Sequence, residues 1–496
     1  MIKFETELKR IKYLVLKNVV ELAAKDNISK LEMLKIPHDI LDGNKAQYRC
    51  CVYRERTIVY ERAQLAAGYH PDDDLTQDLR DIQDEDQMIY VISAACDQCP
   101  INRFTVTEAC RGCVEHKCME ACPVNAITRI NGKSYIDQDK CRECGMCKKV
   151  CPYHAIVEVM RPCRRVCPTG ALEIDPNDRR AMIENEDCIN CGACMAACPF
   201  GAISDKSYIT NVVRLLKEKK NVYAVIAPAI AGQFGNDIKV GQIKNALKSI
   251  GFKDVIEAAC GADAVVVNES KEFMERMKSG EKYMTTSCCP GFVGYIEKKF
   301  KDQVEKISTT VSPMIATGRM IKKIDEDSYV VFVGPCTAKK SEMKKEELKD
   351  AIDYCITFEE VAALLGGLDV DVSECKNSEI EDASSFSRRF AQSGGVTGAI
   401  QNYVKSKGIE GEFNPIKVDG KDNIKKSLVL AKVGKLPFNF IEGMMCEGGC
   451  IGGPATIKSA LKVKGQLNKF SNESQKKSVV DNEKIEKFDN VHMHKK

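Results

Sequence analysis

The amino-acid sequence predicts a multidomain protein of the α+β and α/β classes, in which small cysteine-rich modules precede a larger α/β domain. At 496 residues the chain is too long for one hydrophobic core, so about two to four domains are expected. Sixteen of its 26 cysteines lie between residues 91 and 210. Beyond residue 218, apolar strand-like runs alternate with charged helical stretches, a pattern typical of an α/β domain.

The composition divides the chain into four regions. Residues 1–90 are expected to be mainly helical and to end in an acidic stretch, 71–86, interpreted as a solvated linker. The cysteine-rich region occupies 91–210, and the α/β domain occupies 218–465. Residues 466–496 are rich in Lys, Asn, Ser and Glu, which predicts a polar tail that is either one loosely held helix or disordered.

Net charge and hydropathy exclude some classes of function. A net charge of +3 gives no electrostatic argument for binding nucleic acid or a membrane. No apolar run reaches the roughly 18 residues that a spanning helix needs. Charges scattered through residues 1–27 indicate an amphipathic helix rather than a signal peptide. We therefore expect a cytoplasmic protein.

The cysteines favour metal ligation over disulfides, because the chain is long, lacks a secretion signal and places most cysteines in C-x-x-C groups. Two runs follow the pattern C-x2-C-x2-C-x3-C-P, the bacterial ferredoxin signature, in which three thiolates hold one cubane and the fourth reaches the neighbouring cluster. Zinc sites also use C-x2-C pairs, but not such repeated runs ending in proline. The runs therefore predict [4Fe–4S] clusters.

Two ferredoxin-like units account for all sixteen cysteines as ligands of four [4Fe–4S] clusters. In the first unit, the crossed ligation rule assigns Cys110, Cys113, Cys118 and Cys151 to one cluster, and Cys141, Cys144, Cys147 and Cys122 to a second. In the second unit, the third cluster takes Cys188, Cys191, Cys194 and Cys167. An isolated pair is the obvious candidate to complete the fourth, which takes Cys96, Cys99, Cys163 and Cys198. The first unit is then inserted within the second. Cys50 and Cys51 stay unassigned.

Three further cysteine motifs lie far apart in the α/β domain: TTSCCPGFV (285–293), VGPCTAKKSE (333–342) and EGMMCEGGCIGGP (442–454). Each follows an apolar, strand-like run, so each cysteine is expected at a strand end or in a loop, where α/β domains place their ligands. Together the motifs can supply four thiolates.

These motifs resemble those of the [FeFe]-hydrogenases, and they occur in the same order. The resemblance covers about 250 residues and implies two lobes, each a small mixed sheet with flanking helices, around a buried cofactor. That cofactor is the H-cluster, a [4Fe–4S] cubane joined through a cysteine to a diiron unit with CO, cyanide and a bridging dithiolate amine. The resemblance implies that Cys289, Cys336, Cys446 and Cys450 hold the cubane and that Cys450 bridges to the diiron unit.

The resemblance also implies residues that surround the diiron unit. Lys339 matches a lysine that hydrogen-bonds one cyanide, and the segment with Ala227 and Pro228 resembles the one that cradles the other. A cyanide nitrogen is an anionic acceptor, which an ammonium group and backbone N–H groups suit. Met444 matches a methionine of the diiron pocket, although an ordinary core position explains it too.

A proton relay is implied by five further matches. Cys288 matches the free cysteine beside the bridging amine, and Glu269, Ser308, Glu272 and Arg276 match the residues that lead from it to the surface. Read without the resemblance, Glu272 and Arg276 would be a helical salt bridge four residues apart. Phe292, Gly334 and Met314 depart from the family pattern, which indicates a divergent subgroup and leaves rate, catalytic bias and oxygen response open.

The function that this pattern favours is the reversible interconversion of protons and H2. Ferredoxin or a similar small carrier is the expected electron partner, and hydrogenase maturation proteins would have to install the diiron unit. Three alternatives stay open: a non-catalytic relative that serves in iron–sulfur assembly, a hydrogen sensor, and an electron-transfer subunit of a larger complex.

Overall fold

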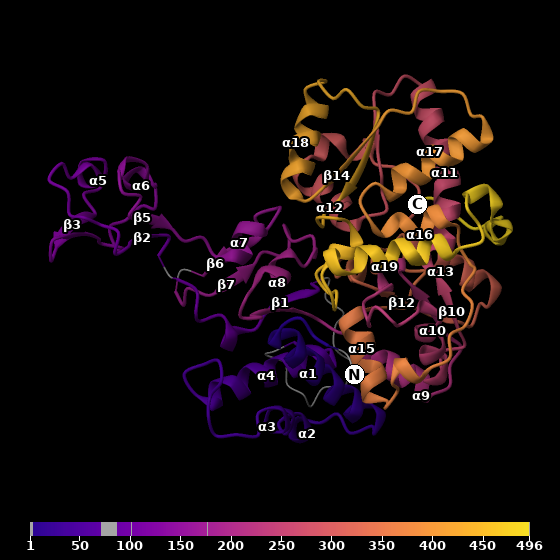
Figure 1. Cartoon of the computed structure of the whole chain (residues 1–496), viewed down its shortest axis with the longest axis horizontal. Coiled ribbons are helices and arrows are strands. Elements are labelled where there is room, and N and C mark those ends of the chain that lie inside the picture. Colours follow the sequence, from indigo (N-terminus) through magenta and orange to yellow (C-terminus); the bar gives the residue numbers. More distant parts are fainter. Residues whose placement is uncertain (1–2, 71–86, 101, 176, 496) are drawn as a thin grey trace.

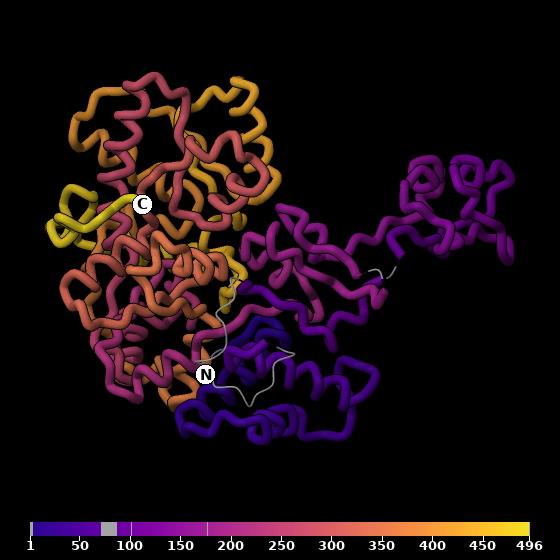
Figure 2. Tube along the Cα trace, turned by 180° about the vertical axis from the view of Figure 1, so that it is seen from behind, coloured from indigo at the N-terminus to yellow at the C-terminus, as the bar shows by residue number. Residues whose placement is uncertain are grey.

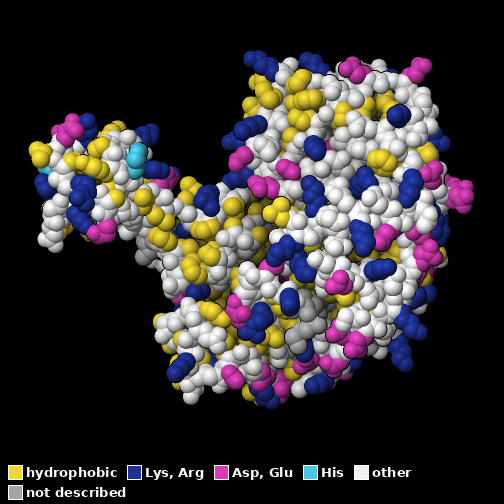
Figure 3. Space-filling view, in the orientation of Figure 1, with side chains coloured by type: hydrophobic (Ala, Val, Ile, Leu, Met, Phe, Trp, Pro, Cys, Tyr) yellow, Lys and Arg dark blue, Asp and Glu magenta, His cyan; other side chains and the backbone are white. Residues whose placement is uncertain are grey.

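A computed structural model describes residues 3–70, 87–100, 102–175 and 177–495 of the chain, so the predicted acidic linker at 71–86 lies outside the described residues. The N-terminal and C-terminal parts form one body (Figures 1 and 2). Part of the cysteine-rich region, residues 104–158, projects from this body as an arm. Acidic and basic side chains are interspersed over the face shown in Figure 3, in keeping with the small net charge. No described helix is long and apolar enough to cross a membrane.

The N-terminal part is helical, as its sequence predicted. It comprises α1 (Glu7–Ala24), α2 (Lys30–Met33), α3 (Ile36–Ile40) and α4 (Val52–Ala67). Helix α1 is capped by Thr6, whose side chain accepts a hydrogen bond from the Lys9 N–H. One face of α1, with Val15 and Val19 fully buried, packs against α4 and against α15 (Phe358–Gly367) of the C-terminal domain. This part is therefore attached to the C-terminal domain.

The cysteine-rich part is built from short strands and single-turn helices. They are β1 (Ile89–Val91), β2 (Phe104–Val106), α5 (Lys117–Glu120), β3 (Ile127–Ile130), β4 (Lys133–Ile136), α6 (Met146–Val150), β5 (Ile156–Glu158), α7 (Pro162–Val166), β6 (Leu172–Ile174), β7 (Ala181–Ile183), α8 (Ala193–Ala197) and β8 (Ile203–Asp205). All four strand pairs, β1–β8, β2–β5, β3–β4 and β6–β7, are antiparallel. Strand β1 precedes the arm in the sequence and β8 follows it, and the two strands pair (Figure 1). The arm is therefore inserted within a second unit, called the outer unit, which is formed by β1 and by the elements from α7 to β8.

The C-terminal domain contains two parallel sheets. The four-stranded sheet has the order β10 (Asp254–Glu257), β9 (Val222–Ile226), β12 (Tyr329–Gly334), β13 (Tyr354–Thr357), and the three-stranded sheet has the order β11 (Met284–Thr285), β15 (Phe440–Met444), β14 (Pro415–Asp419). Every strand pair described in these sheets is parallel, so the mixed sheets implied by the resemblance are wrong. Helical crossovers between successive strands account for this, because they return the chain to the same edge.

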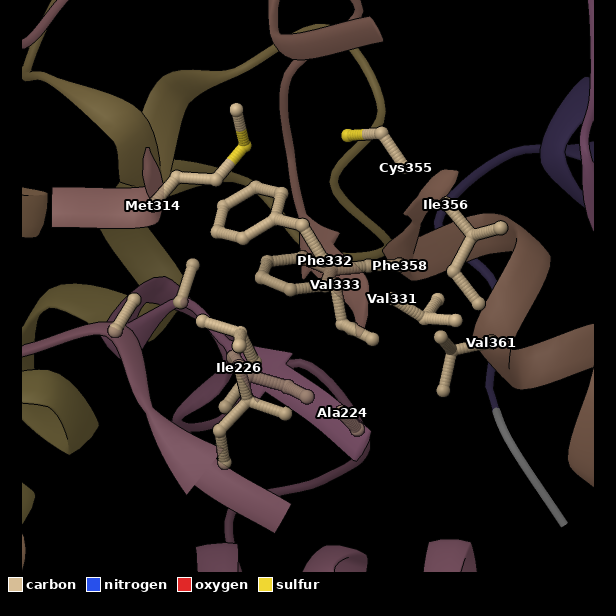
Figure 4. Packing of buried hydrophobic residues seen from close by; sticks show 14 of the residues in the cluster. Ala224, Ile226, Met314, Val331, Phe332, Val333, Cys355, Ile356, Phe358 and Val361 are labelled. Atoms are coloured by element: carbon tan, nitrogen blue, oxygen red, sulfur yellow. The ribbon is translucent and has the colours of Figure 1, made fainter. Parts of the chain in front are cut away.

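The helices of this domain cover the two sheets. The longer ones are α9 (Ile209–Lys217), α10 (Val240–Ser249), α11 (Ala258–Lys278), α12 (Pro290–Lys299), α13 (Pro313–Ile324), α17 (Gly395–Lys407), α18 (Lys421–Lys432) and α19 (Ala460–Glu473), with α14 (Ala338–Glu342) and α16 (Ser385–Arg388) as short turns. Figure 4 shows the apolar packing around the four-stranded sheet, where Val331 and Ile356 of adjacent strands meet Phe358 and Val361 of α15. Cys355 is part of this core and is 1% exposed.

The prediction of a loosely held or disordered polar tail is wrong. Residues 460–473 form α19, on which Leu467 is fully buried, and the following chain buries Val479, Phe488 and Met493. The Met493 carbonyl also accepts a hydrogen bond from the Val311 N–H. The few apolar residues among the lysines and asparagines are spaced so that they face the domain, and their burial outweighs the polar composition.

A buried lysine joins the cysteine-rich part to the C-terminal domain. The Lys340 side chain is fully buried, and its Nζ lies 2.7 Å from Oδ2 of Asp205 at the end of β8 and 3.0 Å from Oε1 of Glu360 on α15. It also donates to the Lys206 carbonyl. Burial lowers the pKa of Lys340, but the two carboxylates more than offset it and leave the pKa raised, so the lysine stays charged.

Replacing this lysine tests its structural role. Lys340→Met should lower the free energy of unfolding by about 3–5 kcal/mol, because it leaves Asp205 and Glu360 without a buried counter-ion. Urea unfolding measures the loss. Lys299→Met is the matched control, since the exposed Lys299–Asp187 pair also joins these two parts and should contribute about 1 kcal/mol or less. Equal effects of the two substitutions would contradict the assigned role.

Candidate functional site

The three cysteine motifs of the C-terminal domain meet at one cavity. Strand β12 leads into Cys336, β11 leads into Cys289, and β15 leads into Cys446 and Cys450. All four cysteines line a buried cavity of about 100 Å³, together with Cys288. Because the strands of each sheet are parallel, their carboxyl ends open toward the same space.

Burial is the largest cause of the raised pKa values of these thiols. Together with the charge of Cys289, burial raises the pKa of Cys336 to about 11 and that of Cys450 to about 12. Burial raises the pKa of Cys446 well above its usual value, and Cys336, Cys289 and Cys450 add to the shift. The four groups are therefore close enough to interact. Iron ligation requires thiolates, so cluster binding here would release protons.

The backbone between the last two cysteines fits a close approach to a cluster. Gly448 and Gly449 have φ angles of +79° and +89°, which side chains other than glycine rarely adopt. A Cβ on Gly449 would lie 2.7 Å from the Ser393 nitrogen, so the backbone leaves no room for one. The glycine pair thus allows Cys446 and Cys450 to face one cavity.

The residues implied around the diiron unit line the same cavity. Ala227 and Pro228 follow β9, Met444 ends β15, and Lys339 lies on α14. The Lys339 Nζ lies 2.6 Å from Glu342 and 3.3 Å from the Cys288 carbonyl oxygen. Burial lowers the pKa of Lys339, but the charge and hydrogen bond of Glu342, together with the charges of Cys336 and Cys288, outweigh it and leave the pKa raised, so a cation faces the cavity. Glu342 was not identified from the sequence, although it stands three residues after Lys339.

Three of the implied relay residues are hydrogen-bonded together. Arg276 Nη2 donates to Glu272 Oε1 over 2.6 Å, and the Ser308 hydroxyl donates to Glu272 Oε2 over 2.7 Å. The helical ion pair expected from spacing alone therefore exists, and it also contacts the serine. Burial raises the pKa of Glu272, but the Thr309 N–H, the Ser308 hydroxyl and Arg276 outweigh it and leave the pKa lowered.

Glu269 lies beside this network. Its side chain is fully buried, and neither carboxylate oxygen has a hydrogen-bond partner of normal geometry among the described residues. Burial, followed by the Glu272 charge, raises the pKa of Glu269 to about 8, although the nearby Ser308 hydroxyl and Ser287 N–H act to lower it. The Glu269 charge in turn raises the pKa of Cys288, after burial itself. Glu269 is thus near Cys288, but no direct hydrogen bond joins it to Ser308, whose hydroxyl is turned to Glu272.

One of the residues that depart from the family pattern, Met314, lines the cavity directly, and a second, Gly334, acts through its neighbour Phe332. The Phe332 side chain also lines the cavity. A Cβ on Gly334 would lie 2.4 Å from the Phe332 ring, so this ring occupies space that a side chain at 334 would need. The sequence showed the missing side chain at 334 but not what replaces it. The ring of Phe292 packs in the same way against Gly443.

In the arm, the eight cysteines predicted for two clusters form two groups. Cys110, Cys113, Cys118 and Cys151 line one small cavity. Burial raises the pKa of Cys147, and the charges of Cys141, Cys144 and Cys122 raise it further, which identifies the second group. In each group the last cysteine of one half joins three from the other, as the crossed ligation rule predicts.

The outer unit brings together the other two predicted sets. Burial raises the pKa of Cys163 to about 11, with contributions from Cys198, Cys99 and Cys96. Burial also raises the pKa of Cys194 well above its usual value, with contributions from Cys191, Cys188 and Cys167. Across the described ranges no three His, Cys, Asp or Glu side chains are placed to hold a single metal ion. A four-iron cubane needs its thiolates further apart than one ion does.

The predicted third cluster adjoins the C-terminal cavity. The charge of Cys336 contributes to the raised pKa of Cys191, which burial brings to about 12. The Thr337 hydroxyl donates to the Asn190 carbonyl over 2.7 Å, and this fixes the two cysteine loops side by side. Cys50 and Cys51 are exposed at the start of α4, with their sulfurs 3.9 Å apart, and belong to none of these sets.

Fold and site together define an iron–sulfur protein with a buried cluster site between two parallel sheets. Comparison with known families agrees. Residues 220–454 match the family described as "Iron only hydrogenase large subunit, C-terminal domain", residues 157–209 match an "LdpA Fe-S cluster-binding domain", and residues 134–157 match a "4Fe-4S binding domain". Residues 220–454 are thus similar to the iron-only hydrogenase large-subunit family, and residues before them are similar to iron–sulfur binding domains.

The similar proteins include hydrogenases and an iron–sulfur assembly factor. "Iron hydrogenase 1" of Clostridium pasteurianum is 28% identical over 371 residues, which cover 64% of each chain. The "Cytosolic Fe-S cluster assembly factor NAR1" of Kluyveromyces lactis is 31% identical over 119 residues, which cover 24% of this chain and 25% of that protein. A solved structure of apo [FeFe]-hydrogenase HydA1 from Chlamydomonas reinhardtii superposes with a TM-score of 0.48 at 20% identity, covering 56% of this chain and 91% of that one.

The fourth predicted cluster is testable through its most distant ligand. Cys96→Ser should lower the iron content of anaerobically reconstituted protein by about four atoms per chain, because a thiolate ligand is lost. Cys50→Ser, a cysteine outside all the sets, should leave the iron content unchanged. Iron and sulfide analysis measures both. Equal iron in the Cys96→Ser and unaltered proteins would contradict the assignment.

The raised pKa of Glu269 predicts a pH-dependent stability. The folded protein holds this proton up to about pH 8, whereas the unfolded chain releases it above about pH 4.5, so stability should fall as pH rises through this window. Glu269→Gln removes that loss. Its free energy of unfolding should therefore rise relative to that of the unaltered protein between about pH 5 and 8. Glu275→Gln, exposed on the same helix, is the control. Parallel pH profiles for all three proteins in urea unfolding would refute the shift.

Proposed function

We propose that this protein is a hydrogenase that interconverts protons and electrons with H2. The observation that carries the proposal is the composition of the cavity wall: Cys288 and Lys339 face the same space as the four cluster cysteines. An assembly of four thiols alone suits a cubane. A free thiol and a buried cation are additional groups that a cubane does not need.

The residues present fit the H-cluster. Cys289, Cys336, Cys446 and Cys450 would hold the cubane, with Cys450 as the bridge to the diiron unit. Lys339, kept charged by Glu342, would bind one anionic cyanide, and the backbone at Ala227 and Pro228 would bind the other. Met444 would close the pocket on its apolar side. When bound, the cofactor would supply the redox chemistry by which protons and electrons combine to H2.

The protein itself would deliver protons and electrons by separate routes. Arg276, Glu272 and Ser308 are joined by hydrogen bonds and would form the entrance of the proton route. Glu269 is largely protonated at neutral pH, so it can pass a proton to Cys288. A water or a turn of the Ser308 hydroxyl would close the gap to Glu269. Electrons would enter at the arm from ferredoxin or a similar carrier and pass through four [4Fe–4S] clusters to the cubane.

A role in iron–sulfur assembly is the second candidate, because the NAR1 relative shares part of the sequence. That role requires the cysteine sets but gives no reason for a buried Glu269 with a raised pKa near Cys288. The relay residues therefore distinguish the two functions.

Cys288→Ala should reduce hydrogen evolution by at least about 100-fold, because it removes the last proton carrier beside the cofactor. The assay uses reduced methyl viologen and anaerobic protein supplied with the diiron cofactor. Infrared bands of CO and cyanide should be retained, which shows that the loss is not one of cofactor binding. Cys355→Ala, which also removes a buried thiol, is the control with activity largely unchanged.

Full activity in Cys288→Ala would refute the relay while leaving the enzyme. No activity in the unaltered protein, with CO and cyanide bands present, would refute the hydrogenase proposal and favour assembly or sensing.

A further inference from the structure

Two adjacent cysteines, Cys50 and Cys51, have no part in the function proposed above. Both are exposed between α3 and α4, and their sulfurs lie 3.9 Å apart. The cysteine sets assigned to clusters do not include them. The pair therefore presents two thiols at one place on the surface, where a single reagent can reach both.

The segment before the pair is held in place by α4. Oε1 of Glu55, a residue that is 4% exposed, accepts hydrogen bonds from the backbone N–H groups of Gln47, Tyr48 and Arg49. These bonds attach the residues directly before the pair to the same helix that Cys51 caps. The fold, and not only adjacency in the sequence, thus keeps the two thiols together.

Cys51 has the surroundings of a reactive thiol. It is the N-terminal cap of α4, a helix of 16 residues. The Arg54 N–H is the largest cause that lowers the pKa of Cys51, and the Cys50 thiol, the Tyr53 N–H and the Arg54 charge lower it further, against a smaller effect of burial. The thiolate is the nucleophilic form of cysteine, and helix N-termini and neighbouring arginines favour it. Cys51 is thus the better nucleophile of the pair.

The other cysteines outside the cluster sets lack these surroundings. Cys260 and Cys355 are buried, and burial raises the pKa of both. Cys288 lines the buried cavity of the C-terminal domain. Cys375 is partly exposed, but burial and the charge of Asp371 raise its pKa. Exposure and a lowered pKa coincide at Cys51, which distinguishes it from these four cysteines.

The pair stands beside the segment that carries Cys96, a predicted ligand of the fourth cluster. Arg54 Nε donates to the Ala94 carbonyl over 2.8 Å, and Arg54 Nη2 lies 3.6 Å from Oδ2 of Asp97. Arg49, on the other side of the pair in the sequence, lies 3.7 Å from Oδ1 of Asp97. A reaction at the pair thus takes place next to this segment without using a cluster ligand.

We propose that Cys50 and Cys51 form a thiol–disulfide exchange site whose substrate is a low-molecular-weight disulfide. The Cys51 thiolate attacks one sulfur of the substrate, which releases one small thiol and leaves a mixed disulfide on Cys51. Cys50 then loses its proton, attacks the Cys51 sulfur and releases the second small thiol. Two protein thiols and one disulfide thus give one protein disulfide and two small thiols, and two electrons pass from the protein to the substrate.

The protein disulfide formed in this way is readily reversed. Adjacent Cα atoms lie about 3.8 Å apart, whereas disulfides usually join Cα atoms that are about 4.4–6.8 Å apart. A ring closed between neighbouring residues is therefore strained, and strained, exposed disulfides are the ones that thiols reduce easily. The state of the pair thus follows the ratio of small disulfide to small thiol.

The first test treats the anaerobically reconstituted full-length protein with oxidised glutathione and follows each cysteine by mass spectrometry of alkylated peptides. We expect the peptide with Cys50 and Cys51 to lose two hydrogens at least about tenfold faster than Cys375 acquires glutathione. Excess reduced glutathione should restore both hydrogens, and the iron content should stay constant. A pair that reacts no faster than Cys375, or whose oxidation proceeds in step with loss of iron, would overturn the proposal.

Two variants then assign the roles. Cys50→Ser should stop at the mixed disulfide, so that glutathione stays on Cys51, whereas Cys51→Ser should slow the attack by at least about tenfold. Cys375→Ser is the matched control and should leave the reaction of the pair unchanged. Equal rates in Cys50→Ser and Cys51→Ser would overturn Cys51 as the attacking thiol. Glutathione that persists on Cys51 in the unaltered protein would overturn ring closure, and this measurement needs no variant to fold.

Discussion

The parallel direction of the strands in the two C-terminal sheets is the constraint on which the site depends. Each cysteine motif directly follows a strand, so the direction of that strand decides where its thiols lie. Strands β11, β12 and β15 all deliver their motifs to one cavity, although the motifs are separated by long stretches of sequence. One antiparallel strand would have sent its cysteines to the opposite edge.

The same region fixes the iron–sulfur part against the C-terminal domain. Lys339 and Lys340 are adjacent on α14 and point to different partners: Lys339 faces the cavity with Glu342, and Lys340 joins Asp205 to Glu360. The Thr337–Asn190 hydrogen bond lies in the same loop region. The four residues after Cys336 thus form part of the cavity wall and also bind the neighbouring cysteine-rich part. The position of the cavity wall therefore depends on the position of the cysteine-rich part.

The ionisable side chains near the cavity differ in their charge states. Lys339 is paired with Glu342, whereas Glu269 has no cationic partner among the described residues, and its raised pKa keeps it largely neutral at pH 7. Glu272, only three residues along the same helix, has the opposite shift, because Arg276, Ser308 and Thr309 bind its carboxylate. Two glutamates on one helix thus hold different protonation states, and the difference comes from Arg276, one turn further along the helix, and from neighbours contributed by the segment 308–310.

Much of the local chemistry was predictable from spacing. The C-x2-C-x2-C-x3-C runs set which thiols can share a loop, and the order of three motifs indicated the family of the C-terminal domain. These features are local, since a few residues of backbone determine them. The resemblance extended to Lys339 and the relay residues, whose roles stay predictions. Sheet direction was predicted less well, and the polar tail was wrong, because burial of Val479 and Phe488 depends on partners far away in sequence.

The sequence by itself therefore determined the kind of metal chemistry, the four cysteine groups and the family. The tertiary structure alone decided that Glu342 pairs with Lys339, that Phe332 fills the space left by Gly334, and that Glu269 is buried close enough to Cys288 to raise the pKa of that thiol. The physical reason is range: ligand spacing depends on neighbouring residues, whereas burial, pKa and empty space depend on which distant segments pack together.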